Sequence, residues 1–263
     1  MIKYLKNFWS RQRKAYQGTI TIIILFSMNM INNADRYIIS SVLIDIEKFF
    51  DVSKSIAGLL QTIYLLFFML SSPFNGYLGD RINRKYMLIT GLLLWLVSII
   101  VGSLFNQNQF IYFVITRCFF GIATGIYQPV AIPIIGDRFA HDEKMRSRAL
   151  VLFNMGPPLG IGLSYIIGVL SKELVSDDWR YSMRFTPFFL IFILILILIG
   201  YVEPPKANSK IENEEEQTLL DKNAASAVLK KRKYIQDVKI LFKNRTYVLL
   251  VLAWACGLTS YGM

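Results

Sequence analysis

Three long runs with almost no charged side chains, residues 86–105, 147–170 and 185–202, constrain this chain more than any other feature. Each run is close to the roughly 20 residues that a helix needs to cross the hydrocarbon core of a bilayer. A backbone surrounded by lipid must satisfy its own hydrogen bonds, so such runs are predicted to be helices. Hydrophobic residues make up 54% of the 263 residues, which is more than a soluble chain usually carries. The sequence therefore predicts an all-α membrane protein.

Seven membrane spans are predicted, and the last one ends with the chain. The basic segment before them, residues 1–17, has apolar residues at helical spacing, which favours an amphipathic helix on the inner membrane surface over a signal peptide. The charged segment 204–245 is predicted to be a cytosolic linker, and residues 18–203 a six-helix bundle. The predicted spans are residues 18–44, 55–78, 86–105, 109–137, 147–170, 182–203 and 246–263.

The distribution of positive charge between the spans predicts the orientation. Of the 29 Lys and Arg residues, 22 lie in four segments on one side and four lie on the other side. Cytoplasmic loops carry the excess of Lys and Arg, so the N-terminus is predicted to be cytoplasmic. The net charge of +11 follows this topology, and we expect no nucleic-acid partner. The rich segments are residues 1–17, 79–85, 138–148 and 204–245, and the poor ones are 45–54, 106–108 and 171–181.

Few residues in the chain could support catalysis or metal binding. The two cysteines, Cys118 and Cys256, lie in apolar runs, and His141 is the only histidine. No nucleotide-binding glycine loop or nucleophile elbow is present. We therefore predict no metal, no cofactor and no enzymatic activity, with an intramembrane enzyme as a remote alternative.

The short loop between the second and third spans, residues 76–85, carries the sharpest local pattern, GYLGDRINRK. Glycines let two helix ends approach closely, and an aspartate can accept hydrogen bonds from a helix N-terminus or an arginine. We expect the basic residues to stay at the inner surface. An ordinary basic turn is the alternative. The residues of interest in this loop are Gly76, Gly79, Asp80, Arg81, Arg84 and Lys85.

The fourth span contains Arg117, followed by Gly121 and Gly125. An arginine inside an apolar helix is costly unless it faces a cavity or a partner, and glycines four residues apart make a smooth face for close helix packing. A snorkelling arginine near the outer interface is the alternative.

The fifth span contains Pro157 and Pro158 among glycines that include Gly160 and Gly162. Proline frees a backbone carbonyl and bends a helix, so we expect a bent, closely packed helix at a bundle interface. The pattern leaves open whether this bend is static or moves.

The first span carries a stripe of polar side chains, which should line a cavity. Asn29, Asn33, Arg36 and Ser40 share one face of a helix, with Asn32 beside them and Asp35 at the edge. Asp35 and Arg36 point about 100° apart and are not expected to pair. The alternative is that the span ends near Ile31 and that these residues form an outer loop.

The loop 76–85 resembles the cytosolic signature loop of the major facilitator superfamily, which implies that its six residues of interest form an inner gate between two bundles. The arginine and glycines of the fourth span and the Gly-Pro motif of the fifth resemble that superfamily as well. Residues 29–205 resemble Spinster-type transporters in particular. The ordered motifs behind this resemblance are Asp35-Arg36-Tyr37, residues 42–46, residues 57–62, residues 76–85, Asp178-Trp179, residues 184–187 and residues 203–205.

This resemblance implies a transporter that moves lysophospholipids, sphingosine phosphate or related amphipathic lipids, with proton coupling in part of the family. It implies that Asp35, Arg36 and Arg117 serve substrate binding or coupling. We expect Asn32, Asn33 and Thr124 beside them to complete the candidate site. The family usually has a glutamate in the fourth span where this chain has Thr124. Thr124 cannot exchange a proton, so a relay that pairs Asp35 with a fourth-span acid is not expected here.

Two interpretations of function follow. In the first, the chain transports an amphipathic lipid between two bundles by alternating access. In the second, six spans and the start of a seventh are an incomplete, non-transporting membrane protein that pairs with another copy or a full-length relative.

The linker also contains Glu215, Leu219 and Leu220 at the spacing of an acidic dileucine sorting signal, for which a plain amphipathic turn is the favoured alternative. The sequence is compatible with a lysosomal or a plasma membrane location.

Overall fold

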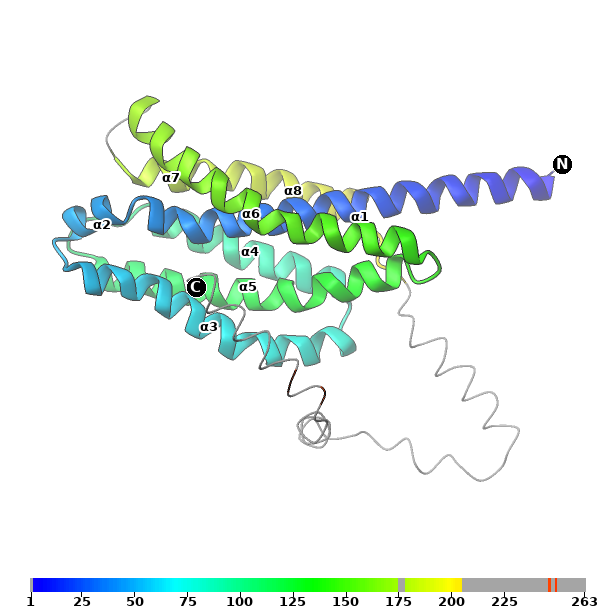
Figure 1. Ribbon diagram of the computed structural model, residues 1–263, viewed down its shortest axis with the longest axis horizontal. Coiled ribbons are helices and arrows are strands. Elements are labelled where there is room, and N and C mark those ends of the chain that lie inside the picture. The colour runs from blue at the N-terminus through cyan, green and yellow to red at the C-terminus, as the bar shows by residue number, and fades with distance from the viewer. Residues whose placement is uncertain (1, 175–177, 205–245, 247–248, 250–263) are drawn as a thin grey trace, which may run out of the picture. The chain divides into compact units, whose positions relative to one another are not determined.

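The computed structural model describes residues 2–174 and 178–204, together with Thr246 and Leu249. The chain divides into two units, Met1–Ala207 and Asn208–Met263. The described helices lie in the first unit, where the long helices run side by side in a bundle (Figure 1). They are α1 (Ile2–Ser41), α2 (Leu43–Phe50), α3 (Lys54–Arg81), α4 (Arg84–Gly102), α5 (Phe110–Arg138), α6 (Glu143–Leu174), α7 (Arg180–Arg184) and α8 (Thr186–Gly200).

Five segments in the described part of the chain are long and apolar enough to cross a membrane. They are Lys54–Gly79, Arg84–Gly102, Phe110–Arg138, Glu143–Ser171 and Arg180–Gly200. Each coincides with one of the predicted second to sixth spans, which confirms an all-α membrane protein with the expected bundle. Helix α1 spans the place of the first predicted span, and its polar residues explain why it is less apolar than the others.

Local sequence signals set most helix ends. The Ser53 hydroxyl accepts a hydrogen bond from the Ile56 amide at the start of α3, and Asn83 accepts one from the Lys85 amide at the start of α4. Such side-chain caps satisfy amides that have no partner within a first helical turn. The sixth span is broken between α7 and α8, where Pro187 in the first turn of α8 cannot donate an amide hydrogen.

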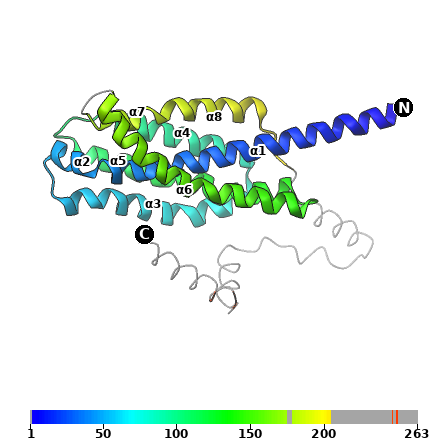
Figure 2. The same ribbon diagram turned by 45° about the horizontal axis from the view of Figure 1, so that its top comes forward.

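The helices pack in pairs, α1 on α6, α3 on α5 and α4 on α5. Large buried side chains such as Trp95, Tyr127 and Phe120 fill the space between the last of these pairs and its neighbours. Turning the view shows α8 lying beside α4 and α1, so that α1 and α4 are flanked on this side by the last span (Figure 2).

Two predictions about helix boundaries differ from the structure. Residues 1–17 do not form a separate helix, because α1 runs without a break from Ile2 to Ser41 and its N-terminal part extends past the other helices (Figure 1). Residues 45–54, predicted as an outer loop, contain most of α2, whose Ile46 and Phe50 are buried. The alternation of apolar and charged residues in this short segment hid an amphipathic helix. The seventh span lies outside the described residues, apart from Thr246 and Leu249.

Candidate functional site

Asp35 faces the interior of the bundle. Its side chain is 4% exposed, and Oδ2 accepts a hydrogen bond of 2.8 Å from Nε1 of Trp95 on α4. Thr186 at the start of α8 and the charge of Arg117 also act on the carboxylate. The first span therefore does not end near Ile31, because Asp35 lies well inside α1 and contacts α4 and α8.

Arg117 is also buried, at 4% exposure. Its guanidinium carbon lies 5.0 Å from the centroid of the Phe113 ring and 5.7 Å from that of Phe120, and Nη2 approaches the Met183 sulfur at 3.5 Å. The Nε atom has no hydrogen-bond partner among the described residues. Arg117 thus does not snorkel to the surface. Its charge is held by aromatic faces and by the nearby carboxylate of Asp35.

Arg36 points to a different side of α1 from Asp35. Its guanidinium carbon lies 5.3 Å from the ring centroids of both Tyr37 and Tyr64, so it is stacked between α1 and α3. Its buried Nε has no hydrogen-bond partner among the described residues, and neither has the buried hydroxyl of Tyr127 on α5. The two adjacent residues of the predicted site thus contact different partners, Asp35 the indole of Trp95 and Arg36 the ring of Tyr64.

Asn32 and Thr124 connect α1 to α5 close to these residues. Nδ2 of Asn32 donates to the Thr124 hydroxyl at 3.1 Å, and that hydroxyl donates to the Phe120 carbonyl at 3.0 Å. Both residues are buried. The Thr124 hydroxyl therefore bridges α1 and α5.

The sequence predicted that the polar stripe of α1 lines one cavity, but part of the stripe packs against another helix. Asn33 donates to the Asn29 carbonyl and side chain, and Asn29 is buried against α6, where its amide donates to the Phe153 carbonyl at 2.8 Å. Helical spacing placed these residues on one face correctly. It could not show that α6 covers the part of that face that carries Asn29.

The inner-gate loop is more deeply built into the bundle than the sequence indicated. Arg84 is 6% exposed, and its Nη1 forms an ion pair of 2.5 Å with Asp137 at the end of α5. Its Nε donates to the Gly79 carbonyl, and its backbone amide donates to Glu203 at 2.9 Å. The prediction placed Arg84 at the inner membrane surface, and the structure adds that its side chain is buried between helix ends. The partly buried carboxylate of Asp137 stabilises it in place.

Two other basic residues at the same end of the bundle bind the C-terminal end of the sixth span. Nζ of Lys85 donates to the carbonyls of Leu198 and Tyr201 at 3.2 and 2.9 Å, and Arg138 donates to the Val202 carbonyl. These carbonyls belong to the C-terminal end of α8, where positive charge is favourable. The end of α8 and the loop 76–85 are therefore joined by side chains from both.

The remaining gate residues make looser contacts. Arg81 is exposed, and its guanidinium lies 4.3 Å from the centroid of the Tyr77 ring. A side chain added at Gly79 would press against Val130 of α5, whereas Gly76 is 3.8 Å from Pro129 in the same measure. The backbone of Asp80 lies in the last turn of α3, and its side chain is not among the described ones.

Sequence reasoning missed Asp137, Arg138 and Glu203. A signal was present, because each of these charged residues directly ends an apolar run on the side where the basic loop 76–85 was placed. Opposite charges at neighbouring helix ends are natural partners, but one sequence does not reveal which ends are neighbours.

The predicted packing glycines separate into two groups. A methyl group at Gly121, Gly125 or Gly160 would overlap neighbouring atoms, namely the Tyr64 carbonyl, the Ser71 hydroxyl and the Met30 carbonyl. A methyl group at Gly162 would have nothing within 4 Å. Pro158 lies inside α6, which continues through it from Glu143 to Leu174. The dileucine residues Glu215, Leu219 and Leu220 and most of the linker lie outside the described residues.

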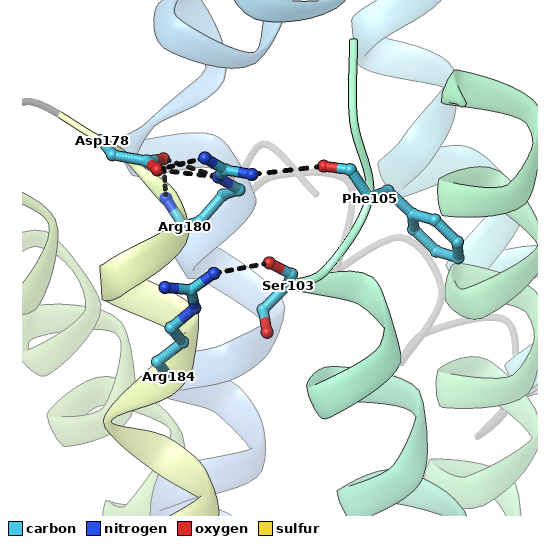
Figure 3. A network of polar contacts seen from close by, with 5 residues as sticks. All are labelled: Ser103, Phe105, Asp178, Arg180 and Arg184. Atoms are coloured by element: carbon cyan, nitrogen blue, oxygen red, sulfur yellow. Dashed lines mark hydrogen bonds and ion pairs between the residues drawn. The ribbon is translucent and has the colours of Figure 1, made fainter. Parts of the chain in front are cut away.

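At the opposite end of the bundle, a compact polar network joins α7 to the segment that follows α4 (Figure 3). Asp178 and Arg180 form an ion pair of 2.6 Å, Arg180 also reaches the Phe105 carbonyl at 3.5 Å, and Arg184 donates to the Ser103 carbonyl at 3.2 Å. Partial burial opposes ionisation of Asp178, but the hydrogen bonds and charge of Arg180 outweigh it and hold the pKa of the carboxyl below its usual value.

A sequence profile described as Major Facilitator Superfamily matches residues 25–263. Protein spinster of Drosophila melanogaster is 36% identical over 236 residues, which are 90% of this chain and 36% of that protein. Protein spinster homolog 3 of Danio rerio is 35% identical over 90% of this chain and 44% of its own length. The sphingosine-1-phosphate transporter SPNS2 of Danio rerio is 35% identical over 86% of this chain and 42% of its own length.

Solved structures with the same fold include a bacterial homologue of the human lysosomal transporter Spinster, in an inward-facing and occupied conformation. It has a TM-score of 0.63 at 22% identity and covers 73% of this chain and 46% of its own. The proton:xylose symporter XylE has a TM-score of 0.66 at 16% identity and covers 79% and 50%. The chain thus spans less than half the length of the curated relatives named here, and its resemblance to Spinster proteins is confirmed.

Proposed function

The chain belongs to the major facilitator superfamily, and on that premise we propose that it supplies the first six-helix bundle of a secondary active transporter for an amphipathic lipid. The bundle would form one wall of a central site, and rocking between two bundles would expose that site to either side of the membrane. The protein would lie in the lysosomal or the plasma membrane, with its N-terminus in the cytoplasm.

One observation carries the substrate proposal, namely that Arg36 is held between two tyrosine rings with an unpaired Nε. A cation kept in place by aromatic faces, with donor capacity unused, is arranged to receive an anionic group by charge-assisted hydrogen bonds. The unpaired hydroxyl of Tyr127 adds a further polar contact from α5. The apolar surfaces of the spans would accept the tail of the same molecule.

The name of one relative supports an anionic, single-tailed lipid as substrate. One protein that is 35% identical to this chain is named as a sphingosine-1-phosphate transporter. A sphingosine phosphate joins a phosphate head to one long apolar chain, and such a molecule matches an arginine beside membrane-facing helices. We extend that substrate class, and not that one molecule, to this chain.

The coupling part of the proposal rests on Asp35. An ionisable residue inside a membrane bundle is a candidate for proton coupling. The Asp35 carboxylate accepts a hydrogen bond from Trp95, and Thr186 and the charge of Arg117 also act on it. Thr124 takes no part in proton exchange and instead fixes Asn32. In this proposal protonation of Asp35 would change its contacts with α4 and α8, whereas the substrate would bind to Arg36, which faces α3.

The loop 76–85 would serve as the inner gate. Arg84 and Lys85 hold the ends of α5 and α8 to the start of α4, so these three helices would move together at the inner end. Arg81 and Asp80 remain as the residues that would meet the second bundle when the inner side closes.

A flux measurement tests this function. The protein would be reconstituted in vesicles preloaded with a fluorescent sphingosine phosphate analogue, and release would be followed with and without a proton gradient. We expect release that depends on the protein, that Arg36→Gln abolishes, and that loses its dependence on the gradient in Asp35→Asn. The Arg184→Gln variant is the matched control, because Arg184 binds a backbone carbonyl at the far end of the bundle.

The result that would overturn the transport proposal is folded protein that releases the lipid no faster than empty vesicles. Release that remains unchanged across pH in both wild type and Asp35→Asn would assign Asp35 a structural role only.

A further inference from the structure

A groove of about 270 Å³ lies between α4 and α5, near the end of the bundle that carries Phe105. It is separate from the Arg36 site and from the gate loop, neither of which contributes a residue to it. Its lining residues are Leu94, Val97, Ser98, Val101, Phe105, Tyr112, Ile115, Thr116 and Phe119.

The serine and threonine hydroxyl groups that line the groove already have hydrogen-bond partners within the protein. Both donate within their own helices, Ser98 to the Leu94 carbonyl at 2.7 Å and Thr116 to the Phe113 carbonyl at 2.7 Å. The rest of the lining is apolar apart from the exposed Tyr112. Buried water needs two or more polar partners, so a groove of this kind favours an apolar occupant.

The walls of the groove belong to two membrane-spanning helices. Four apolar lining residues are 38% to 55% exposed, namely Val97 and Val101 on α4 and Ile115 and Phe119 on α5. Both helices are long and apolar enough to cross the membrane. The groove is therefore continuous with the surface that meets the bilayer.

Two aromatic residues line the groove next to a polar segment. The Phe105 and Tyr112 rings stack with centroids 6.1 Å apart. Figure 3 shows the Phe105 ring pointing away from Arg180, while the Phe105 carbonyl faces that arginine. Directly after Phe105 come the exposed amide side chains of Asn106, Gln107 and Asn108, which can donate hydrogen bonds to ester or phosphate oxygens.

The geometry points to a binding site for a bilayer phospholipid, with one acyl chain in the groove between α4 and α5 and the headgroup beside the amides of residues 106–108. An apolar cavity of about 150 Å³ is enough to take up benzene, so this groove has room for a segment of an acyl chain. Such a lipid would be held longer than its neighbours, and it would occupy this site whether or not the protein transports anything.

The test uses the purified protein in nanodiscs whose phosphatidylcholine carries a photoreactive group in the middle of one acyl chain. After illumination, labelled peptides are identified by mass spectrometry. We expect the labelling of α4 and α5 at the groove to exceed severalfold that of the exposed apolar face of α8, which includes Ile195 and Ile199. Equal labelling of the two faces would overturn the proposal, because ordinary solvation by lipid predicts it.

Two variants distinguish a specific site from a reactive surface. Val101→Phe fills the groove and should reduce its labelling to the level of α8, whereas Ile195→Phe, a comparable change on α8, should leave it unchanged. If Val101→Phe does not fold, Ile115→Phe replaces it from the opposite wall. Groove labelling that persists in a folded, filled variant, or a cross-link from the groove to a second copy of the chain in place of lipid, would also overturn the proposal.

Discussion

The side-chain amide of Asn29 on α1 donates a 2.8 Å hydrogen bond to the carbonyl of Phe153 on α6. Phe153 lies four residues before Pro157, and a proline cannot supply the amide hydrogen that this carbonyl would otherwise receive. A polar side chain of one helix thus satisfies a backbone group that proline has freed in its neighbour. This contact lies where Gly156 and Gly160 allow α1 and α6 to touch.

Replacing Asn29 with leucine should therefore destabilise the bundle. Hydrogen bonds between membrane helices contribute on average about 0.6 kcal/mol and at most about 1.7 kcal/mol, and a loss in the upper part of that range is expected because the carbonyl is left without a partner. Thermal unfolding in detergent measures the change. The control is Asn154→Leu, since the Asn154 amide bonds only within its own helix. Equal midpoints for the two variants would contradict the interpretation.

Gly160 and Gly162 form a matched pair two residues apart on the same helix. A methyl group at Gly160 would overlap the Met30 carbonyl, so Gly160→Ala should cost about 1–3 kcal/mol of the free energy of unfolding. A methyl group at Gly162 has nothing within 4 Å, and Gly162→Ala should be neutral or stabilise by up to about 1 kcal/mol through helix propensity. Unfolding midpoints of both variants decide, and the reverse order would refute the packing described for α1 and α6.

The buried pair of Arg84 and Asp137 should behave differently from the exposed Arg81. Arg84→Met leaves Asp137 without its ion pair and is expected to cost about 3 kcal/mol. Arg81→Met removes only a contact with the Tyr77 ring and should cost about 1 kcal/mol or less. The double variant Arg84→Met with Asp137→Leu should regain part of the loss. If both single variants unfold at the same temperature, Arg84 does not hold the loop to α5.

The Asp178–Arg180 pair predicts a small dependence of stability on acid. Because the pKa of Asp178 is lower in the folded protein than its usual value, the pair stabilises the fold fully above that usual value and progressively less as pH falls through the lower one. The contribution should be at most about 1 kcal/mol. Asp178→Asn should flatten this part of the acid unfolding curve, and Glu143→Gln, which removes an 87% exposed carboxylate, should not. Identical curves for the two variants would contradict the assignment.

Much of this architecture could be predicted because lipid leaves a chain few choices. Run length and loop charge located α3 to α6 within a few residues, since helices alone can cross a bilayer. The order of motifs from Asp35 to Glu203 predicted the family. Contacts between helices could not be predicted from one sequence. The spacing of Asn29 and Arg36 puts them on one face, but the placement of α6 decides that Asn29 is covered while Arg36 faces α3.

The same limit applies to charged residues at helix ends. Arg84 and Lys85 were recognised as basic residues of a gate, but their partners Asp137, Leu198 and Tyr201 come from helices that are distant in sequence. Burial of Arg84 follows from that tertiary arrangement and has no local signature. The short helix α2 was missed because eight residues carry too little periodicity to be separated from a loop.

The central claim is that Arg36 receives the anionic head of a single-tailed lipid, and equilibrium binding tests it most directly. Purified protein would be titrated with fluorescent sphingosine phosphate and with the matching sphingosine that lacks phosphate. The account predicts tighter binding of the phosphorylated lipid to wild type and to Arg184→Gln, and loss of that preference in Arg36→Gln. A preference for phosphate that survives in folded Arg36→Gln protein would contradict the claim.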